Sequence, residues 1–299
     1  MRCLSWRSAP LLLVSSILLA ACTGAGRGGP IEHPAVERLV LRVATQGGFI
    51  GPQFRFTSFP GFTLLGDGRV IVPGAQIELY PGPALPAVNV RRLTEAGIQA
   101  ILDEVLKTGV FSTSAEYRGA QNVVADAPDT VFTLVANGRQ VTVLVYGLGT
   151  LPAGNTHTGI SAEELATHAA LFHLSERLMN LDAWLPANGW ADPAWTPFQP
   201  DALRLLVRNA DADPSDGSGI ANQLVDWPTS DDPATFGTPA GAPLDARCGV
   251  VSGPDAAVWY QALSAANQLT RFTHGGHRYE VSVRFMLPDE ELTCPDVIR

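Results

Sequence analysis

The chain has 299 residues, of which 46% are apolar and 16% are charged, and its formal net charge is −9. This composition excludes a disordered acidic chain and predicts a folded protein with a sizeable core. Residues 1–21 contain two arginines and no acid, so the remainder carries 18 basic and 29 acidic residues, a net charge of −11. Such a balance argues against nucleic acid as a partner. The 29 glycines and 23 prolines favour turns and short strands over a helical bundle.

The first 22 residues have the pattern of an export signal. Arg2 and Arg7 precede an apolar run over residues 11–20, which is too short for an ordinary spanning helix. The run ends in Leu19-Ala20-Ala21-Cys22, which resembles the lipobox of bacterial lipoprotein signal peptides. This resemblance implies that Cys22 carries a diacylglycerol thioether and becomes the first mature residue. The alternative is an ordinary secretory signal that leaves Cys22 as a free thiol.

A lipid on Cys22 is the membrane anchor that this pattern predicts. Two or three acyl chains anchor a protein durably, whereas one holds it only marginally. No later stretch reaches the roughly 18 consecutive apolar residues that span a bilayer. We therefore expect a cleaved signal peptide over residues 1–21, a short flexible tether over residues 22–34, and a location at the extracytoplasmic face of the cell membrane.

Residues 35–182 are expected to form a first α+β unit. Strand patterns lie at residues 38–45, 62–65, 69–72, 131–135 and 140–146, and residues 76–80 are expected to be another short extended piece. Thr94 is the predicted N-cap of a helix that ends at Gly109. Asn137-Gly138, between the last two strand patterns, is the strongest hairpin signal in the chain.

A second helix of this unit is expected to begin at a capping box, Ser161 to Glu164, and to run to about residue 181. Its expected buried positions are Leu165, Ala169, Phe172, Leu178 and Leu181. Residues 183–200 then contain Trp184, Trp190 and Trp195 among several prolines. This composition predicts a packed connection.

Residues 201–299 are expected to form a second α+β unit. Its predicted parts are a strand at 203–208, a long polar loop at 209–247, a helix opened by Gly253-Pro254-Asp255, and strands at 269–273 and 279–286. The predicted fold class is therefore α+β, with two small antiparallel-sheet units that each carry covering helices.

The four cysteines predict one disulfide. Cys3 leaves with the signal peptide and Cys22 is consumed by the lipid, so Cys248 and Cys294 remain as an even pair in an oxidising compartment. A zinc site is the weaker alternative, because neither cysteine belongs to a C-x-x-C motif or lies near a histidine pair.

Together, the lipobox, the turn Leu64-Leu65-Gly66-Asp67-Gly68-Arg69-Val70, and the ending Val283-Arg284-Phe285-Met286-Leu287-Pro288-Asp289-Glu290 with Cys294 resemble uncharacterised lipoproteins of high-GC bacteria. The resemblance spans most of the mature chain. It implies an envelope location and brings no known activity, cofactor or site residue.

No catalytic motif is present. The sequence lacks Gly-x-Ser-x-Gly and His-Glu-x-x-His. Gly147-Leu148-Gly149 has Pro152 at the third glycine position of the dinucleotide fingerprint, and the single lysine, Lys107, lies inside a predicted helix. We therefore expect neither an enzyme nor a cofactor, although a Ser-His-Asp hydrolase with members far apart in sequence stays open.

Three groups of residues are weak candidates for metal binding. His157, His168 and His173 lie in or near one helix, but the last two are about 140° apart on a helical wheel. His274 and His277 flank Gly275-Gly276 and are the better pair, although no carboxylate lies beside them in the sequence. Asp211-Ala212-Asp213-Pro214-Ser215-Asp216-Gly217 evokes a calcium loop but departs from the EF-hand register at Gly217 and Asn222. In each case a solvated turn or capping role is the simpler interpretation, and no metal site is predicted.

Two further sets of residues, a pair of aspartates and a set of aromatic residues, each have a functional and a structural interpretation. Asp126 and Asp129 place two carboxylates near a hairpin, as acid/base pairs require, but turn capping by such residues is commoner. The aromatic residues could form a sugar-stacking platform or seal a domain junction; they are Trp184, Trp190, Trp195, Phe198, Trp227 and Trp259. The function expected is a non-catalytic binding or adaptor module for an envelope protein or wall polymer, and the alternative is a small-ligand or carbohydrate binder at the Trp-rich connection.

Overall fold

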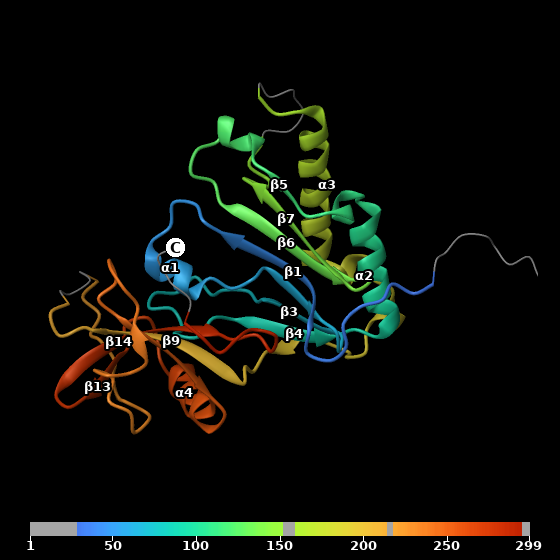
Figure 1. Ribbon diagram of the computed structural model, residues 1–299. Coiled ribbons are helices and arrows are strands. Elements are labelled where there is room, and N and C mark those ends of the chain that lie inside the picture. Colours follow the sequence, from blue (N-terminus) through green and yellow to red (C-terminus); the bar gives the residue numbers. More distant parts are fainter. Residues whose placement is uncertain (1–28, 152–158, 214–217, 295–299) are drawn as a thin grey trace, which may run out of the picture. The chain divides into compact units, whose positions relative to one another are not determined.

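The computed structural model describes residues 29–151, 159–213 and 218–294. The predicted signal peptide, most of the tether including Cys22, and His157 lie outside the described residues. Residues Ile31–Arg299 form one compact unit, separate from Met1–Pro30. This unit is α+β, with two mixed and mostly antiparallel sheets (Figure 1), so the α+β class that the sequence predicts is confirmed.

The first sheet has eight strands in the order β5-β7-β6-β1-β2-β3-β4-β8. Its strands are β1 (Leu39–Gln46), β2 (Phe62–Leu65), β3 (Arg69–Pro73), β4 (Val88–Arg92), β5 (Ala115–Tyr117), β6 (Asp129–Ala136), β7 (Arg139–Tyr146) and β8 (Thr196–Pro197). All neighbours are antiparallel except β5 and β7. The predicted hairpins are confirmed, and Asn137 and Gly138 both have the positive φ, 51° and 69°, that a two-residue turn of this kind requires.

Two helices, α2 (Glu95–Lys107) and α3 (Ala162–Met179), pack against this sheet (Figure 1). Both predicted caps are confirmed: the Thr94 hydroxyl accepts a hydrogen bond from the Gly97 N–H, and the Ser161 hydroxyl accepts one from the Glu164 N–H. The first hydrophobic core joins the helices to the sheet; its members include Val40, Phe132, Val143, Ile101, Leu102, Leu171 and Leu174.

The predicted inner face of α3 was partly wrong. Leu178 and the following Leu181 are buried, but Ala169 and Phe172 are exposed and Leu165 is only half-buried. The residues that face inward are Thr167, His168, Leu171, Leu174 and Leu178. The α3 helix carries apolar residues on several sides, so periodicity alone does not predict which face is buried. The contacts with the sheet and with α2 decide which face points inward.

The second sheet has six strands in the order β10-β13-β14-β9-β12-β11. Its strands are β9 (Ala202–Asn209), β10 (Leu224–Asp226), β11 (Thr238–Pro239), β12 (Arg247–Ser252), β13 (Arg271–His274) and β14 (His277–Phe285). The chain also contains α4 (Pro254–Ser264) and the short helix α1 (Pro52–Thr57). The second core surrounds the fully buried Trp259 and includes Leu65, Ile71 and Val88 from strands β2, β3 and β4 of the first sheet.

The prediction of one long loop was wrong. The segment 209–247 is not one loop, because it contains the short strands β10 and β11, which are recognisable only by their pairing with β13 and β12. Residues 76–80 belong to neither sheet. β3 pairs directly with β4, from Pro73 opposite Val88, so the intervening segment has no strand to bond with.

Candidate functional site

An open groove of about 650 Å³ lies at the C-terminal end of α3. Its lining comes from the last two turns of the helix and the residues after it, and includes Glu176, Arg177, Met179 and Trp184. Met179 is exposed, and the lining mixes apolar and charged side chains. A groove of this size has room for a drug-sized ligand or a short peptide segment.

Trp184, the aromatic residue of the groove, is held by its neighbours. Its indole N–H donates to the Arg177 carbonyl at 2.8 Å, and the Arg177 guanidinium lies 4.3 Å from the ring centroid. Arg177 in turn pairs with Glu104 of α2, with 2.7 Å between Nε and Oε1. These contacts fix the orientation of the Trp184 ring, and the Arg177 guanidinium covers one face of it.

The other tryptophans do not form one stacking platform with Trp184. Trp190 and Trp195 contact each other edge to face at 5.7 Å, and Arg91 lies 3.8 Å over Trp190. Trp227 and Trp259 lie in the second core, 4.6 Å apart and only 7% and 0% exposed. Phe198 is buried in that core too. The six aromatic residues are thus divided between the two cores.

Asp211 and Asp213 of the calcium-like loop form hydrogen bonds with the basic side chains His277 and Arg208. Asp211 Oδ2 lies 2.6 Å from His277 Nδ1, and its Oδ1 accepts the Arg278 N–H at 2.8 Å. The hydrogen bond from His277, followed by that from Arg278, lowers the pKa of Asp211 to about 2. Hydrogen bonds from Arg208 at 2.6 and 2.7 Å likewise lower the pKa of Asp213.

These pairings leave the EF-hand-like reading without support. Asp216 lies outside the described residues, and within the described ranges no group of three or more His, Cys, Asp or Glu side chains has metal-binding geometry. Arg208 also pairs with Glu280, and its hydrogen bonds with Asp213 and Glu280 raise its pKa. The corner between β9, β13 and β14 is therefore a network of alternating charges.

The other candidate residues have structural roles. His168 is 5% exposed and His173 lies at the groove with its side chain 82% exposed, so they occupy different faces as predicted. The Asp129 carboxylate accepts from Arg118 at 3.2 Å, and Asp126 sits in a turn with φ of 57°. These positions favour turn formation over an acid/base pair.

A cluster of arginines near the C-terminus was not anticipated from the sequence. Arg204 on β9 lies opposite Arg284 on β14, and the two residues are 9% and 8% exposed. Burial, and then the charge of Arg284, lower the pKa of Arg204 to about 10. The sequence signal was the even spacing of Arg204 and Arg208 in β9 and of Arg278 and Arg284 in β14, which places the arginines of each strand on one face of the sheet.

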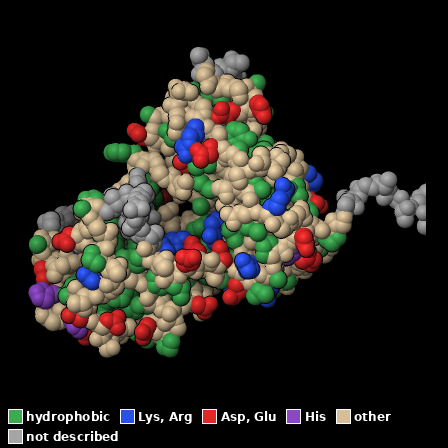
Figure 2. All heavy atoms as spheres, in the orientation of Figure 1, with side chains coloured by type: hydrophobic (Ala, Val, Ile, Leu, Met, Phe, Trp, Pro, Cys, Tyr) green, Lys and Arg blue, Asp and Glu red, His purple; other side chains and the backbone are tan. Residues whose placement is uncertain are grey.

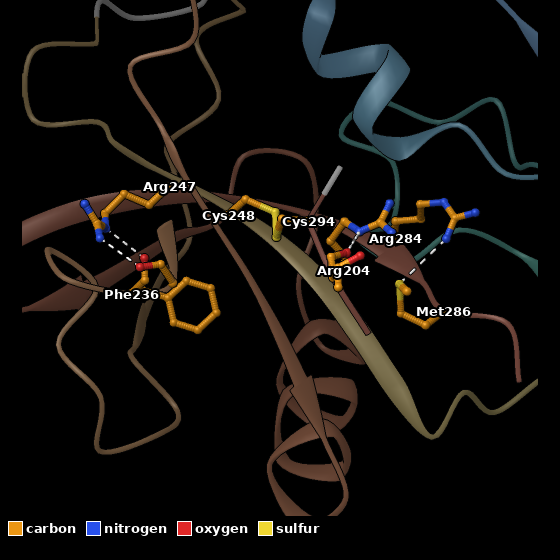
Figure 3. Close-up of a disulfide and its surroundings, with 9 residues drawn as sticks. Arg204, Phe236, Arg247, Cys248, Arg284, Met286 and Cys294 are labelled. Atoms are coloured by element: carbon orange, nitrogen blue, oxygen red, sulfur yellow. Dashed lines mark hydrogen bonds between the residues drawn. A yellow bond between two sulfur atoms is a disulfide. The ribbon is translucent and has the colours of Figure 1, made fainter. Parts of the chain in front are cut away.

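We call residues 286–294 the C-terminal clasp because they neutralise these arginines. Both Glu290 oxygens accept hydrogen bonds from Arg284 at 2.7 Å, and Asp289 pairs with Arg42 of the first sheet at 2.6 Å. The Thr293 carbonyl accepts from Arg204. The disulfide between Cys248 and Cys294, with Cα atoms 6.0 Å apart, fastens the end of the clasp to β12 (Figure 3).

No helix among the described residues is both long and apolar enough to cross a bilayer. The groove, the charged corner and the clasp contain no recognisable catalytic constellation, so geometry alone assigns no reaction to them. The chain matches no protein-family model, no curated protein and no solved structure.

Proposed function

We propose that the protein is a lipid-anchored module of the bacterial cell envelope that binds a partner and catalyses no reaction. The single observation that carries this proposal is the order of basic residues, apolar run and Leu19-Ala20-Ala21-Cys22 at the N-terminus. Cys22 then carries the lipid, residues 22–34 act as a tether, and the folded part works at the extracytoplasmic face of the cell membrane. No cofactor or nucleic acid takes part.

The Cys248–Cys294 disulfide supports an oxidising compartment. In this proposal residues 35–182 and 201–299 are two α+β units with covering helices, and residues 183–200 connect them. The module presents its surface to an envelope protein or a wall polymer, which the tether of at most about 40 Å keeps within reach of the membrane.

A small ligand or carbohydrate is a second candidate for the bound partner. The groove of about 650 Å³ favours it, because Trp184 of the predicted connection lines that groove together with polar side chains such as Glu176. A ligand of this kind would contact the edge of the indole and the last turns of α3.

The anchor is tested by expressing the chain with Cys22→Ala and measuring the mass and the membrane fraction of the product. We expect wild type to sediment with membranes and to carry the mass of a diacylglyceryl cysteine. We expect Cys22→Ala to lose both properties. Cys3→Ala is the matched control, since Cys3 leaves with the signal peptide. Equal membrane retention and equal mass of wild type and Cys22→Ala contradict the proposal.

The partner is sought by crosslinking the anchored protein in cells and identifying what is bound by mass spectrometry. One stoichiometric protein that is lost with Cys22→Ala supports the adaptor role. Retention of that protein by the unanchored variant would mean that the tether does not position the module.

A further inference from the structure

The hairpin that joins β13 to β14 places two histidines side by side. His274 and His277 are opposite each other in the antiparallel register, and Gly275 and Gly276 form the turn between them with φ of 59° and 82°. Directly opposed residues project from the same face of a sheet with Cβ atoms about 4.5–5.5 Å apart. The two histidine side chains therefore start from neighbouring positions on one face at the tip of the hairpin.

A carboxylate that is 66 positions away in the sequence completes the arrangement. Asp211 Oδ2 lies 2.6 Å from His277 Nδ1, while its other oxygen is fixed by the Arg278 N–H at 2.8 Å. A carboxylate that accepts from Nδ1 sets the tautomer of the ring and directs the Nε2 lone pair outward. This is the carboxylate that the sequence around the two histidines lacked.

The histidines are accessible to an ion. The His277 side chain is 60% exposed, and His274 is half-buried, with no hydrogen bond or ion pair from its imidazole to any described residue. Figure 2 shows histidine side chains on the surface over the end of the molecule that contains β13. The guanidinium of the neighbouring Arg278 donates a hydrogen bond to the Asp211 carbonyl at 2.8 Å.

We propose that His274 and His277 bind one borderline divalent cation through a ring nitrogen each, with Asp211 orienting His277 and water filling the other positions. Imidazole nitrogen favours Zn²⁺ and Cu²⁺ over Ca²⁺ or Mg²⁺, and Cu²⁺ binds more tightly than Zn²⁺ to a given nitrogen site. Two protein donors agree with the absence of a three-ligand group within the described ranges. The site is independent of the lipid anchor and adds a ligand that the proposed envelope function does not require.

The test is a calorimetric titration of the mature chain, residues 22–299, with CuCl₂ and separately with ZnCl₂ at pH 7.5. The protein carries no histidine tag and contains Cys22→Ala, so that no free thiol competes for the metal. We expect one equivalent of Cu²⁺ to bind in the micromolar range and Zn²⁺ to bind more weakly. His274→Ala and His277→Ala should each weaken binding at least about tenfold.

Two variants separate the roles. Asp211→Asn should weaken binding by about ten- to a hundredfold and keep the stoichiometry, because it removes the orienting carboxylate and no ligand. His173→Ala is the matched control, since His173 is another exposed histidine, on α3, and it should bind as wild type does.

A measurement on the wild-type chain keeps the proposal testable if a variant fails to fold. In ¹⁵N-labelled protein, Zn²⁺ should shift the Nε2 resonance of His277 and leave Nδ1 hydrogen-bonded. Binding that survives His277→Ala in a folded variant overturns the proposal. So does a wild-type spectrum in which neither His274 nor His277 responds to Zn²⁺.

Discussion

Replacing Glu290 with glutamine tests whether the C-terminal clasp stabilises the fold by neutralising buried charge. Glu290 accepts two hydrogen bonds of 2.7 Å from Arg284 and one of 3.0 Å from the Leu287 N–H. The side chains of the pair are only 9% and 17% exposed. Glutamine keeps the shape but not the charge, and it leaves Arg284 beside Arg204 without a carboxylate partner.

Removing one member of a buried ion pair typically costs about 3–5 kcal/mol, because the other charge stays desolvated and unpaired. Glu290 keeps some solvent contact, so we expect a loss of about 3 kcal/mol for Glu290→Gln. With a urea dependence of about 3 kcal/mol per M for a unit of this size, the unfolding midpoint should fall by about 1 M. Glu291→Gln is the matched control, since Glu291 is exposed. It should change stability by less than about 0.5 kcal/mol.

The effect should depend on pH. Burial alone would raise the pKa of Glu290, but the hydrogen bonds and charge of Arg284, with smaller effects from Leu287 and Arg42, hold that pKa below its usual 4.5. A carboxyl whose pKa is lowered by folding stabilises the protein above its unfolded pKa and loses that effect as the pH falls through the folded value. The difference between wild type and Glu290→Gln should therefore shrink below pH 4.5. Equal midpoints for Glu290→Gln and Glu291→Gln at pH 7 would refute the reasoning.

Two further stability predictions concern His168 and the disulfide. His168 is buried, neither ring nitrogen has a hydrogen-bond partner within the described residues, and burial lowers its pKa despite the opposing charge of Glu164. Since the unfolded state then binds the proton more readily, wild type should lose free energy of unfolding between pH 7.5 and 5.5, and His168→Leu should lose less over the same range in urea titrations. Cys248→Ala combined with Cys294→Ala opens a link between residues 46 positions apart and should cost about 4 kcal/mol, measured as the fall in the urea midpoint; an unchanged midpoint would contradict a stabilising role.

Local sequence patterns predicted the elements whose signals lie within a few residues. The helix caps at Thr94 and Ser161 and the Asn137-Gly138 turn are correct because a side chain or a positive φ determines each one locally. The strands β10 and β11 were missed for the opposite reason. They have three and two residues, and only hydrogen bonds to β13 and β12 make them strands.

It was harder to predict which face of an element is buried than to predict that the element exists. The α3 helix begins where its capping box indicates, yet Phe172 is exposed and Leu171 is buried. Adjacent apolar residues give α3 two possible apolar faces, and the buried face is the one that packs against the sheet. The sequence also contained all six aromatic residues of the supposed platform, but their division between two cores depends on contacts between distant segments.

The charged sites show why few functional motifs can be recognised in this sequence. Arg42 and Asp289 are 247 positions apart, and Asp211 and His277 are 66 apart. A motif records residues that chemistry needs at a fixed spacing along one segment, whereas these pairs are assembled from strand ends and loops that meet only in the folded unit. His274 and His277 had no carboxylate nearby in the sequence, and Asp211 had a cation-binding pattern in the wrong register. Each signal was weak by itself because its partner lay in a distant segment of the chain.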